Sequence, residues 1–494
     1  MSSGASVERY RALFEPRGVI VAGASSHPGK FGFVAAHNVL AHGYKGEVFL
    51  TNRDGAEVLG RRALASIDEV PDGAADLVFV CTPAPTAVDI VRAAAARGVR
   101  AAFVASGGFR ESGDSGAAAE RELVSVCDEL GVLLAGPNGQ GVISTPVSLC
   151  AQIVAPNPPP GRIAVASQSG GFVQAFLNYA RAVGVGVSRA VSAGNAAQTG
   201  VEDFVEFFAE DDATDVALVY LEGITDGRRL YEKLAAAARR KPVVVLKGGA
   251  TAAGAKAAAS HTGALAADDR VFDGVCRQAG LVRADGIRDA FLTAATFATQ
   301  PLPRGPRVFV LTTLGGWGVL TADRIAASRE LELAAFPDDL RAFFDERLPP
   351  RWSRSNPADL AGLETRDTLV ECLARTAIHP EVDAVVLLGI GVQSNLGELE
   401  RHGPFFPDHG LERIVAFHAR QDARYAEAAV DAARAGAKPV VVVSELAEAA
   451  PDNPGMATLR QRGGMAHPSA EEAIGALERM VRYARWRRDL AANL

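Results

Sequence analysis

Hydrophobic positions in this chain form short, nearly continuous runs rich in valine, leucine and phenylalanine, and the stretches between them have the length and alanine content of helices. A short apolar run between turn residues is typical of a strand buried on both faces, as in a parallel sheet. Regular alternation of such strands with helices predicts a doubly wound α/β architecture. In the first part of the chain the expected strands are 18–24, 46–52, 76–82, 101–107 and 131–137.

Two proline-rich segments divide this pattern. PNPPPG at 156–161 and TQPLPRGPR at 299–307 exclude helix and central strand, because proline has no amide donor and its ring blocks the helical path. The strands expected between them are 162–168, 186–194, 215–223 and 241–249, and those expected after the second are 307–313, 383–391, 413–419 and 438–445. The stretch 471–490 has apolar residues at helical spacing and predicts a C-terminal helix.

The length of the chain agrees with this division. A chain of 494 residues is too long for one hydrophobic core, and domains of ordinary size predict about three. We therefore expect three consecutive doubly wound α/β domains, over residues 1–150, 151–300 and 301–494.

The composition narrows the class of protein. Hydrophobic residues make up 48% and charged residues 22%, as in globular enzymes, and the formal net charge of -7 argues against a nucleic-acid partner. The five cysteines form no CxxC pair, the N-terminus has no features of a signal peptide, and no apolar run approaches the ~18 residues that span a bilayer. We expect a cytoplasmic protein that does not enter a membrane.

Glycine-rich turns follow several of the expected strands. GASSHPGKFG at 23–32 would expose backbone N–H groups at the start of a helix, where phosphate binds, and Lys30 could add a charge. This turn is neither a GxGxxG fingerprint nor a P-loop, and a tight connection without a ligand is the alternative interpretation. SQSGG at 167–171 predicts a second anion site, formed by Ser169, Gly170 and Gly171.

A single histidine, His261, stands among small residues in KAAASHTGALAADD at 256–269. Imidazole is a good nucleophile at neutral pH, so this residue is either a reactive group on a loop or a surface histidine without a role. The other clustered histidines, His27, His37 and His42, lack the spacing of zinc ligands. We expect no metal site in this chain.

Taken in order, GASSHPGKFG, GGF at 107–109, GPNGQG at 136–141, SQSGG, GN at 194–195, LEGI at 221–224 and SHTGAL at 260–265 resemble the family of NDP-forming acyl-CoA synthetases. This family includes ADP-forming acetyl-CoA synthetase and the α subunit of succinyl-CoA synthetase. TTLGGWGVLTAD at 312–323 and NPADLAG at 356–362 resemble the ligase-CoA domain of its larger members. The resemblance implies a Rossmann-like CoA-binding domain followed by two flavodoxin-like ligase domains.

The resemblance also implies roles for individual residues. His261 would carry a phosphoryl group, Glu222 would orient this histidine, and the turn at Ser169, Gly170 and Gly171 would hold phosphate. The residues implied for coenzyme A are Gly23, Ser25, Lys30, Gly32, Asn52, Arg53, Thr82, Pro83, Gly108 and Asn138. After GPN the family has a small residue and then proline or leucine, as in GPNC, whereas this chain has Gly139 and Gln140. This departure leaves the identity of the acyl group open.

The three α/β series leave no residues for an ATP-grasp module, which the family requires. We therefore expect an oligomer with an ATP-grasp β subunit, which would bind Mg²⁺ with ADP/ATP or GDP/GTP. The expected substrates are acyl-CoA, or the carboxylic acid, and phosphate. The alternative function is a non-catalytic CoA-binding regulatory protein, which loss of His261 or Glu222 would have favoured. We reject a third hypothesis, an NAD(P)-dependent oxidoreductase, because Asn52 and Arg53 occupy the position where such an enzyme has an acidic residue that binds ribose.

Overall fold

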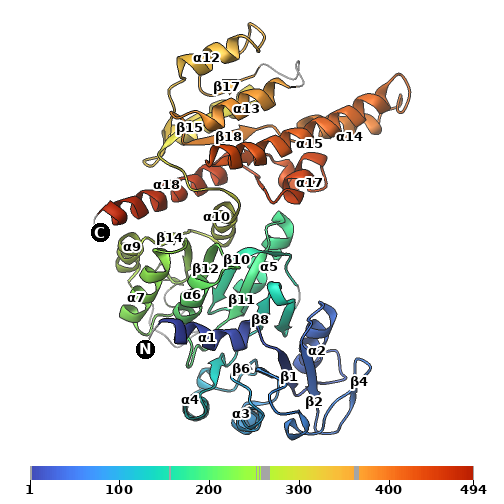
Figure 1. The fold of residues 1–494 in the computed structure, drawn as a ribbon, viewed down its shortest axis with the longest axis vertical. Coiled ribbons are helices and arrows are strands. Elements are labelled where there is room, and N and C mark those ends of the chain that lie inside the picture. The colour runs from blue at the N-terminus through green and yellow to red at the C-terminus, as the bar shows by residue number, and fades with distance from the viewer. Residues whose placement is uncertain are drawn as a thin grey trace. The chain divides into compact units, whose positions relative to one another are not determined.

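The computed structural model describes residues 3–154, 157–251, 253, 254, 256, 268–360 and 367–492. The chain forms two compact units, Met1–Arg181 with Gly186–Phe291, and Ala182–Val185 with Leu292–Leu494 (Figure 1). Two large sheets belong to the first unit and one belongs to the second. The division into three domains remains a prediction.

Five parallel strands form the first sheet, in the order β2-β1-β5-β6-β7. Their bounds are β1 Gly18–Ala22, β2 Glu47–Thr51, β5 Leu77–Val80, β6 Ala101–Val104 and β7 Leu133–Ala135, and a small hairpin pairs β3 Glu57–Val58 with β4 Arg61–Arg62. The helices of this part are α1 Ser3–Phe14, α2 Phe31–Ala41, α3 Ala87–Ala96 and α4 Asp114–Leu130. The strand order reverses between β1 and β5, and at such a point the loops after the strands diverge and leave a crevice.

Seven strands form the second sheet, in the order β14-β13-β12-β10-β11-β8-β9. Its parallel strands are β10 Pro160–Ser167, β11 Val187–Ser192, β12 Val216–Leu221, β13 Val243–Lys247 and β14 Val282–Arg283. An antiparallel hairpin, β8 Gly141–Ser144 and β9 Leu149–Gln152, extends it beside β11. The helices here are α5 Gly170–Val183, α6 Val201–Glu210, α7 Gly227–Ala238, α9 Asp269–Ala279 and α10 Ile287–Thr299. The second sheet therefore takes in residues before the expected boundary at 150.

The sheet of the second unit is parallel and has the order β16-β15-β18-β19-β20, with β17 also paired to β15. Its strands are β15 Arg307–Thr312, β16 Glu332–Leu333, β17 Ala358–Asp359, β18 Ala384–Leu388, β19 Val440–Val443 and β20 Ala466–His467. Its helices are α11 Gly315–Ala326, α12 Asp338–Asp345, α13 Thr368–Ile378, α14 Val392–Arg401, α15 Leu411–Gly436, α16 Leu446–Ala449, α17 Pro454–Gln461 and α18 Ala470–Ala492.

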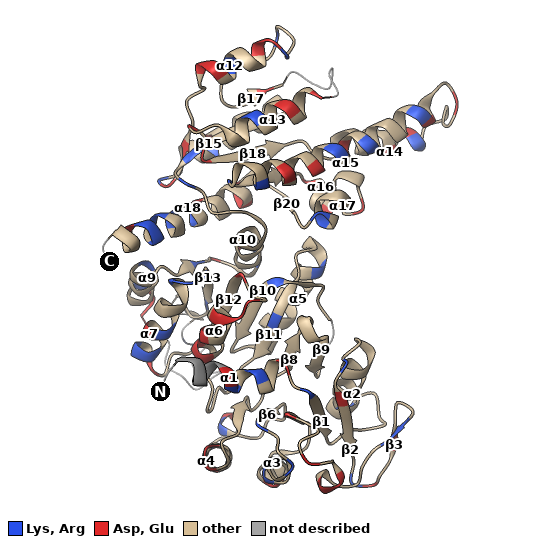
Figure 2. Ribbon diagram, viewed as in Figure 1, with Lys and Arg blue, Asp and Glu red and all other residues tan. Residues whose placement is uncertain are grey.

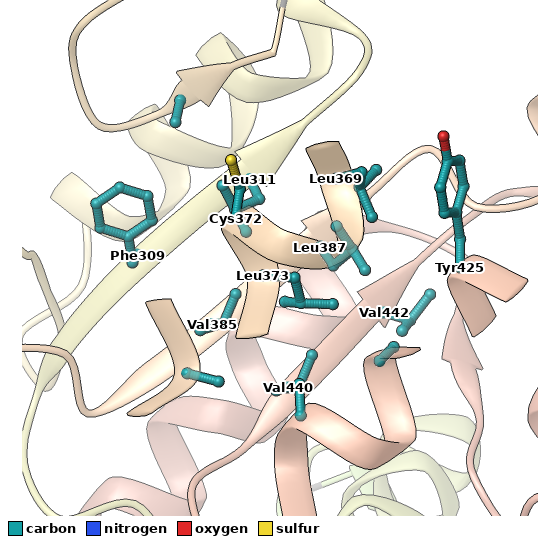
Figure 3. Close-up of a cluster of buried hydrophobic side chains, with 14 of the residues drawn as sticks. Phe309, Leu311, Leu369, Cys372, Leu373, Val385, Leu387, Tyr425, Val440 and Val442 are labelled. Carbon is teal, nitrogen blue, oxygen red and sulfur yellow. The ribbon is translucent and has the colours of Figure 1, made fainter. Parts of the chain in front are cut away.

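Successive residues of β15 point to opposite faces of this sheet, and each face carries its own core. Phe309 and Leu311 pack with α13 and α15 in the cluster drawn in Figure 3, whereas Val308 and Val310 pack with α11 and α18 on the other face. Burial on both faces explains why the strands read as continuous apolar runs. The central strands accordingly carry few charged residues, and acidic and basic residues are interspersed on the helices (Figure 2).

The predicted α/β class with parallel sheets is confirmed, and the C-terminal helix is α18. The strand predicted at 413–419 is wrong, because these residues lie in α15. Within that helix Val415, Asp422, Ala426 and Ala429 are buried at helical spacing, so the long amphipathic pattern outweighs the short apolar run. The two-residue strands β14, β16, β17 and β20 were not predicted, since so few residues show no periodicity. Among the described helices, none is both long enough and apolar enough to cross a membrane.

Candidate functional site

A cleft of about 930 Å³ opens at the carboxyl edge of the first sheet, where the strand order reverses between β1 and β5. Eight of the ten residues expected to bind coenzyme A line it: Gly23, Ser25, Lys30, Gly32, Asn52, Arg53, Thr82 and Pro83. They come from the loops after three neighbouring strands, β2, β1 and β5. The fold therefore gathers residues that are distant along the chain into one lining.

The turn between β1 and α2 shapes one wall of this cleft. Gly23 has a φ of +83°, and a Cβ on Gly32 would lie 1.9 Å from the carbonyl oxygen of Gly23. Only glycine allows this approach of helix to turn. Phe31 and Gly32, the first two residues of α2, line the cleft, and the N–H groups of the first helical residues have no carbonyl of the helix to bind. Lys30 occupies the N-cap position of α2 and is exposed, so its ammonium group can reach a bound anion.

The residues after β2 and β5 have different parts in the cleft. The Asn52 side chain donates to the carbonyl of Ala24 at 2.7 Å and accepts from the N–H of Asp54 at 2.9 Å, so it holds the β1 and β2 turns together. The neighbouring Arg53 side chain is 95% exposed and lies 3.7 Å from the exposed carboxylate of Asp54, a pair that a bound phosphate can replace. Burial raises the pKa of the Cys81 thiol to about 12, which keeps this lining residue neutral at physiological pH.

The two remaining CoA candidates, Gly108 and Asn138, lie outside this lining but near each other. A Cβ on the adjoining Gly107 would lie 3.3 Å from Oδ1 of Asn138. Asn138 is exposed, has a φ of +61°, and its amide lies 3.4 Å from the side-chain oxygen of Asn195 in the loop after β11. This group joins the first sheet to the second within the same unit.

Glu111 organises this junction. Its carboxylate accepts from the N–H groups of Gly108 at 2.6 Å and Phe109 at 3.0 Å, and from the Asn195 side chain at 2.6 Å. Burial raises the pKa of Glu111, but the hydrogen bonds from Asn195, Phe109 and Gly108 outweigh it and hold the pKa below its ordinary value. The glycine loop at 107–109 is thus tied to the second sheet by a carboxylate that stays ionised.

The departure from the family pattern after GPN has a steric reason at its first residue. A Cβ on Gly139 would lie 2.6 Å from the carbonyl oxygen of Ser192 and 2.7 Å from the ring of Phe103. The side chain of Gln140 lies against Gly170, where a Cβ would come within 2.3 Å of its Cδ. Gln140 therefore reaches from the first sheet to the beginning of α5.

The predicted anion turn lies between β10 and α5. Ser167 accepts from the N–H of Ser169 at 3.0 Å and donates to the carbonyl of Ser169 at 2.7 Å, which fixes the turn. Gly170 and Gly171 are the first two residues of α5, a helix of 14 residues, so their N–H groups lie at its positive end. The structure thus places Ser169, Gly170 and Gly171 at the start of a helix, and their binding of phosphate stays a prediction.

Glu222 follows β12 and lies next to this turn. Its backbone N–H donates to Oε1 of Gln168 at 2.6 Å, and its carboxylate shares a hydrogen bond with the phenol of Tyr220. Burial, and then the negative charge of Glu222, raise the pKa of that phenol. The expected phosphoryl carrier, His261, lies outside the described residues.

The described flanks of the segment that contains His261 are held by an ion pair. Nζ of Lys247, at the end of β13, lies 3.6 Å from the carboxylate of Asp269, the first residue of α9, and Arg283 binds the same carboxylate at 2.7 Å. The side chain of Lys247 is almost fully buried. Among the described residues, no three His, Cys, Asp or Glu side chains are grouped to hold a metal ion.

Comparison with protein families assigns residues 17–145 to a CoA binding domain and residues 160–297 to a succinyl-CoA ligase like flavodoxin domain. The acetate–CoA ligase [ADP-forming] I subunit alpha of Pyrococcus furiosus is 32% identical over 481 residues, which cover 96% of this chain and 98% of the relative. The chain belongs to the NDP-forming acyl-CoA synthetase family. The resemblance read from the ordered motifs is therefore confirmed.

Other members of the family extend this comparison. Acetate–CoA ligase [ADP-forming] I of Archaeoglobus fulgidus is 36% identical over 376 residues, and the chain spans only 54% of its length. A solved structure, dinucleotide forming acetyl-coenzyme A synthetase 1 of Ca. Korarchaeum cryptofilum in complex with phosphate and ADP, matches with a TM-score of 0.83 and 29% identity, covering 98% of this chain and 99% of that chain. The chain thus shares the fold of this synthetase over nearly its whole length.

Glu111, Gln168 and Tyr220 were not singled out from the sequence. Gln168 stands inside SQSGG, where only the serine and the glycines were selected as anion ligands. Tyr220 precedes Glu222 by two positions, and the period of a strand puts such residues on one face, so this neighbour could have been found. The pairing of Gln168 with the β12 turn, in contrast, has no signal in the local sequence.

Proposed function

We propose that this chain is the CoA-binding and phosphohistidine-carrying subunit of an NDP-forming acid–CoA ligase, which converts acyl-CoA, NDP and phosphate to a carboxylic acid, CoA and NTP. The observation that carries the proposal is the combination, in one compact unit, of the cleft at β1 and β5 with the anion turn at α5. A phosphate-rich cofactor and an inorganic phosphate each have a matching site.

The residues of the cleft fit the nucleotide end of coenzyme A. The close approach of Gly32 to Gly23 sets the N-terminal end of α2 at the cleft, and Lys30 and Arg53 add two exposed positive charges. Gly108 and Asn138, at the junction of the two sheets, would hold the thioester end. Coenzyme A supplies the thiol that accepts or releases the acyl group.

The first chemical step would take place beside the turn at α5. An oxygen of inorganic phosphate attacks the carbonyl carbon of acyl-CoA, the C–S bond breaks, and the CoA thiolate leaves with a proton taken from the phosphate or the solvent. The product is an acyl phosphate. N–H groups at the start of α5 are pre-oriented toward negative charge, so they stabilise this anion without reorganisation.

In the second step a ring nitrogen of His261 attacks phosphorus, the P–O bond to the acyl group breaks, and the carboxylate leaves. Glu222 would accept a hydrogen bond from the other ring nitrogen and balance the positive charge of the imidazole. An oxygen of NDP then takes the phosphoryl group from His261 and forms NTP.

The nucleotide half of this reaction is proposed to belong to an ATP-grasp partner subunit that binds Mg²⁺ with the nucleotide. The chain spans 98% and 81% of two relatives named as alpha subunits, but only 53–54% of three relatives whose names mention no subunit. The additional length of the second group supports a further module in those relatives, which we propose to be the nucleotide-binding part.

The test is acyl-CoA-dependent phosphorylation of the purified chain. With labelled phosphate and a panel of acyl-CoAs, we expect an acid-labile, base-stable phosphoprotein, and His261→Ala should abolish the label while CoA affinity stays within about twofold. His402→Ala, which changes an exposed histidine, is the matched control and should label normally. Undiminished labelling of His261→Ala would show that another residue carries the phosphoryl group.

The proposed partner is tested by reconstitution. The isolated chain should form no NTP from acyl-CoA, NDP and phosphate, and adding an ATP-grasp subunit should start NTP formation. Sustained NTP synthesis by the pure chain alone would contradict the need for a partner, without affecting the assignment of His261.

A further inference from the structure

The side chain of Gln168 connects the phosphate turn to the turn that carries Glu222. We propose that Gln168, together with Tyr220, is a positioning residue that holds the Glu222 carboxylate at a fixed place relative to the start of α5. Neither residue is proposed to touch a reacting atom. The inference rests on the proposed function. It adds an explanation of how the Glu222 carboxylate and the phosphate site keep a fixed relative position.

Both ends of the Gln168 carboxamide are used. Oε1 accepts from the backbone N–H groups of Glu222 at 2.6 Å and Gly223 at 3.0 Å, while Nε2 donates to the carbonyl of Gly223 at 2.9 Å. The backbone N–H of Gln168 also donates to the carbonyl of Tyr220 at 3.2 Å. Because Gln168 adjoins Ser169, these bonds join the β12 turn directly to the anion turn.

Tyr220 contacts the side chain of Glu222, whereas Gln168 binds the backbone of Glu222. The phenol shares a hydrogen bond with the carboxylate, and its ring stacks on Phe172 with centroids 3.6 Å apart and planes at 10°. Phe172 lies in the first turn of α5, and a Cβ on Gly248 would lie 2.8 Å from the phenol oxygen. Tyr220 is 6% exposed, so this packing holds the phenol that contacts the carboxylate in place.

This arrangement matters because phosphoryl transfer through a histidine needs the imidazole and the phosphate aligned at once. A displacement of about 1 Å of a positioning group can lower a rate by about 100-fold. Glu222 lies on the loop after β12, whereas the phosphate turn follows β10. Without the connection through Gln168 and Tyr220 the two turns could shift relative to each other, even though the strands stay paired.

The first test compares Gln168→Leu with Gln198→Leu. Gln198 is a matched control, since its carboxamide also joins two segments of the first unit, accepting from the N–H of Leu134 at 2.7 Å and donating to Asp128 at 2.7 Å and to the carbonyl of Val132 at 3.3 Å. We expect Gln168→Leu to form phosphohistidine about 100-fold more slowly at saturating phosphate, and Gln198→Leu to stay within about twofold of wild type. CoA affinity should be unchanged in both.

The second test removes only the phenol oxygen. Tyr220→Phe keeps the ring on Phe172 and should lower the rate of phosphoryl transfer about tenfold with an unchanged KM for phosphate, since one hydrogen bond to a carboxylate is lost. Tyr44→Phe removes a comparable bond, to the carbonyl of Pro16 at 2.7 Å, in the first sheet's part of the unit and should have no effect on the rate. A merely structural role would change the melting temperature of both variants alike and the transfer rate of neither.

The outcomes separate this inference from the function on which it rests. If wild-type protein takes no label with any acyl-CoA, the proposed function fails and the positioning role fails with it. If wild-type protein is labelled, and folded Gln168→Leu and Tyr220→Phe are labelled at the wild-type rate, only the positioning role is overturned. Should Gln168→Leu not fold, the isosteric Tyr220→Phe decides alone.

Discussion

At the scale of single residues, the cleft of the first sheet combines fixed and adjustable groups. The backbone N–H groups at the start of α2 are held by the helix, whereas Lys30 and Arg53 are exposed side chains that can move toward a bound anion. Asn52 lies beside them, but both ends of its amide are engaged with the backbone. Charge and shape in the cleft are therefore provided by different residues.

Replacing Lys30 with alanine should weaken CoA binding by roughly fivefold at low ionic strength, because one charge contact to a phosphate is worth about 1 kcal/mol when exposed. The difference from wild type should shrink as salt is added, since salt screens exposed charges. Titration calorimetry at two salt concentrations measures both effects. Lys45→Ala, an exposed lysine outside the cleft lining, should bind as wild type; equal affinities for Lys30→Ala and wild type at both salt concentrations would exclude the contact.

At the scale of elements, close packing of a helix against a turn sets the N-terminal end of α2 at the cleft. The α2 helix begins where Gly32 meets the backbone of Gly23, and the Gly139 loop meets the backbone of Ser192 in a similar way. A side chain at either glycine would separate the two elements it joins. These contacts define the site geometry more strongly than the charges do.

Gly32→Ala should therefore raise the Kd for CoA at least tenfold, a loss of about 1.4 kcal/mol, and lower the melting temperature, because the added Cβ must push α2 away from the turn. Gly274→Ala in α9 is the control, since nothing lies within 4 Å of its added Cβ. That change should stabilise the protein by about 0.5–1 kcal/mol through helix propensity, without altering CoA affinity. Tight CoA binding by a folded Gly32→Ala would show that the turn tolerates a wider separation.

At the scale of the first unit, a buried cation joins segments that are far apart along the chain. The Arg189 side chain is 1% exposed and donates to Asp211 at 3.0 Å, to the carbonyl of Phe14, to Ser144 and to Glu15. Phe14 also stacks on Phe207 of α6, with centroids 5.1 Å apart and planes at 2°. Helix α1 is thereby fastened to the second sheet, although it directly precedes the first strand of the first sheet.

Asp211→Asn should destabilise the first unit by about 3 kcal/mol at neutral pH, because a buried cation loses one of its carboxylates. Burial raises the pKa of Asp211, but hydrogen bonds from Arg189 outweigh this and hold the pKa below its ordinary value of 3.8. The stabilisation is therefore complete above about pH 4 and is lost as the pH falls through the lower folded-state pKa.

The measurement is urea unfolding of wild type and variant from about pH 7 to about pH 3, where the difference between the two should shrink toward the acid end. Glu232→Gln, in the exposed pair with Arg228, should leave the free energy of unfolding unchanged at any pH. A difference between Asp211→Asn and wild type that stays constant with pH would contradict the ionised pair.

Local patterns in the sequence predicted most of the strands correctly for a simple reason. Strands such as 18–22 and 440–443 are buried on both faces, so every position must be apolar or small. The family resemblance implied the CoA candidates, and eight of them line one cleft because the carboxyl ends of parallel strands meet at one edge, which makes the residues after β1, β2 and β5 neighbours. The hairpin β8–β9 was not predicted, since its place beside β11 depends on a partner elsewhere in the chain.

What the sequence by itself determined is therefore the alternation of strands and helices, the order of the motifs, and the family that they identify. Only the tertiary structure decided that Gly139 is required by the backbone of Ser192, and that Gln168 holds the turn of Glu222. The reason is physical: burial on both faces and turn geometry constrain the types of consecutive residues, so the local sequence reveals them. Hydrogen bonds and close approaches between distant segments depend on where the chain returns, and no local pattern records that.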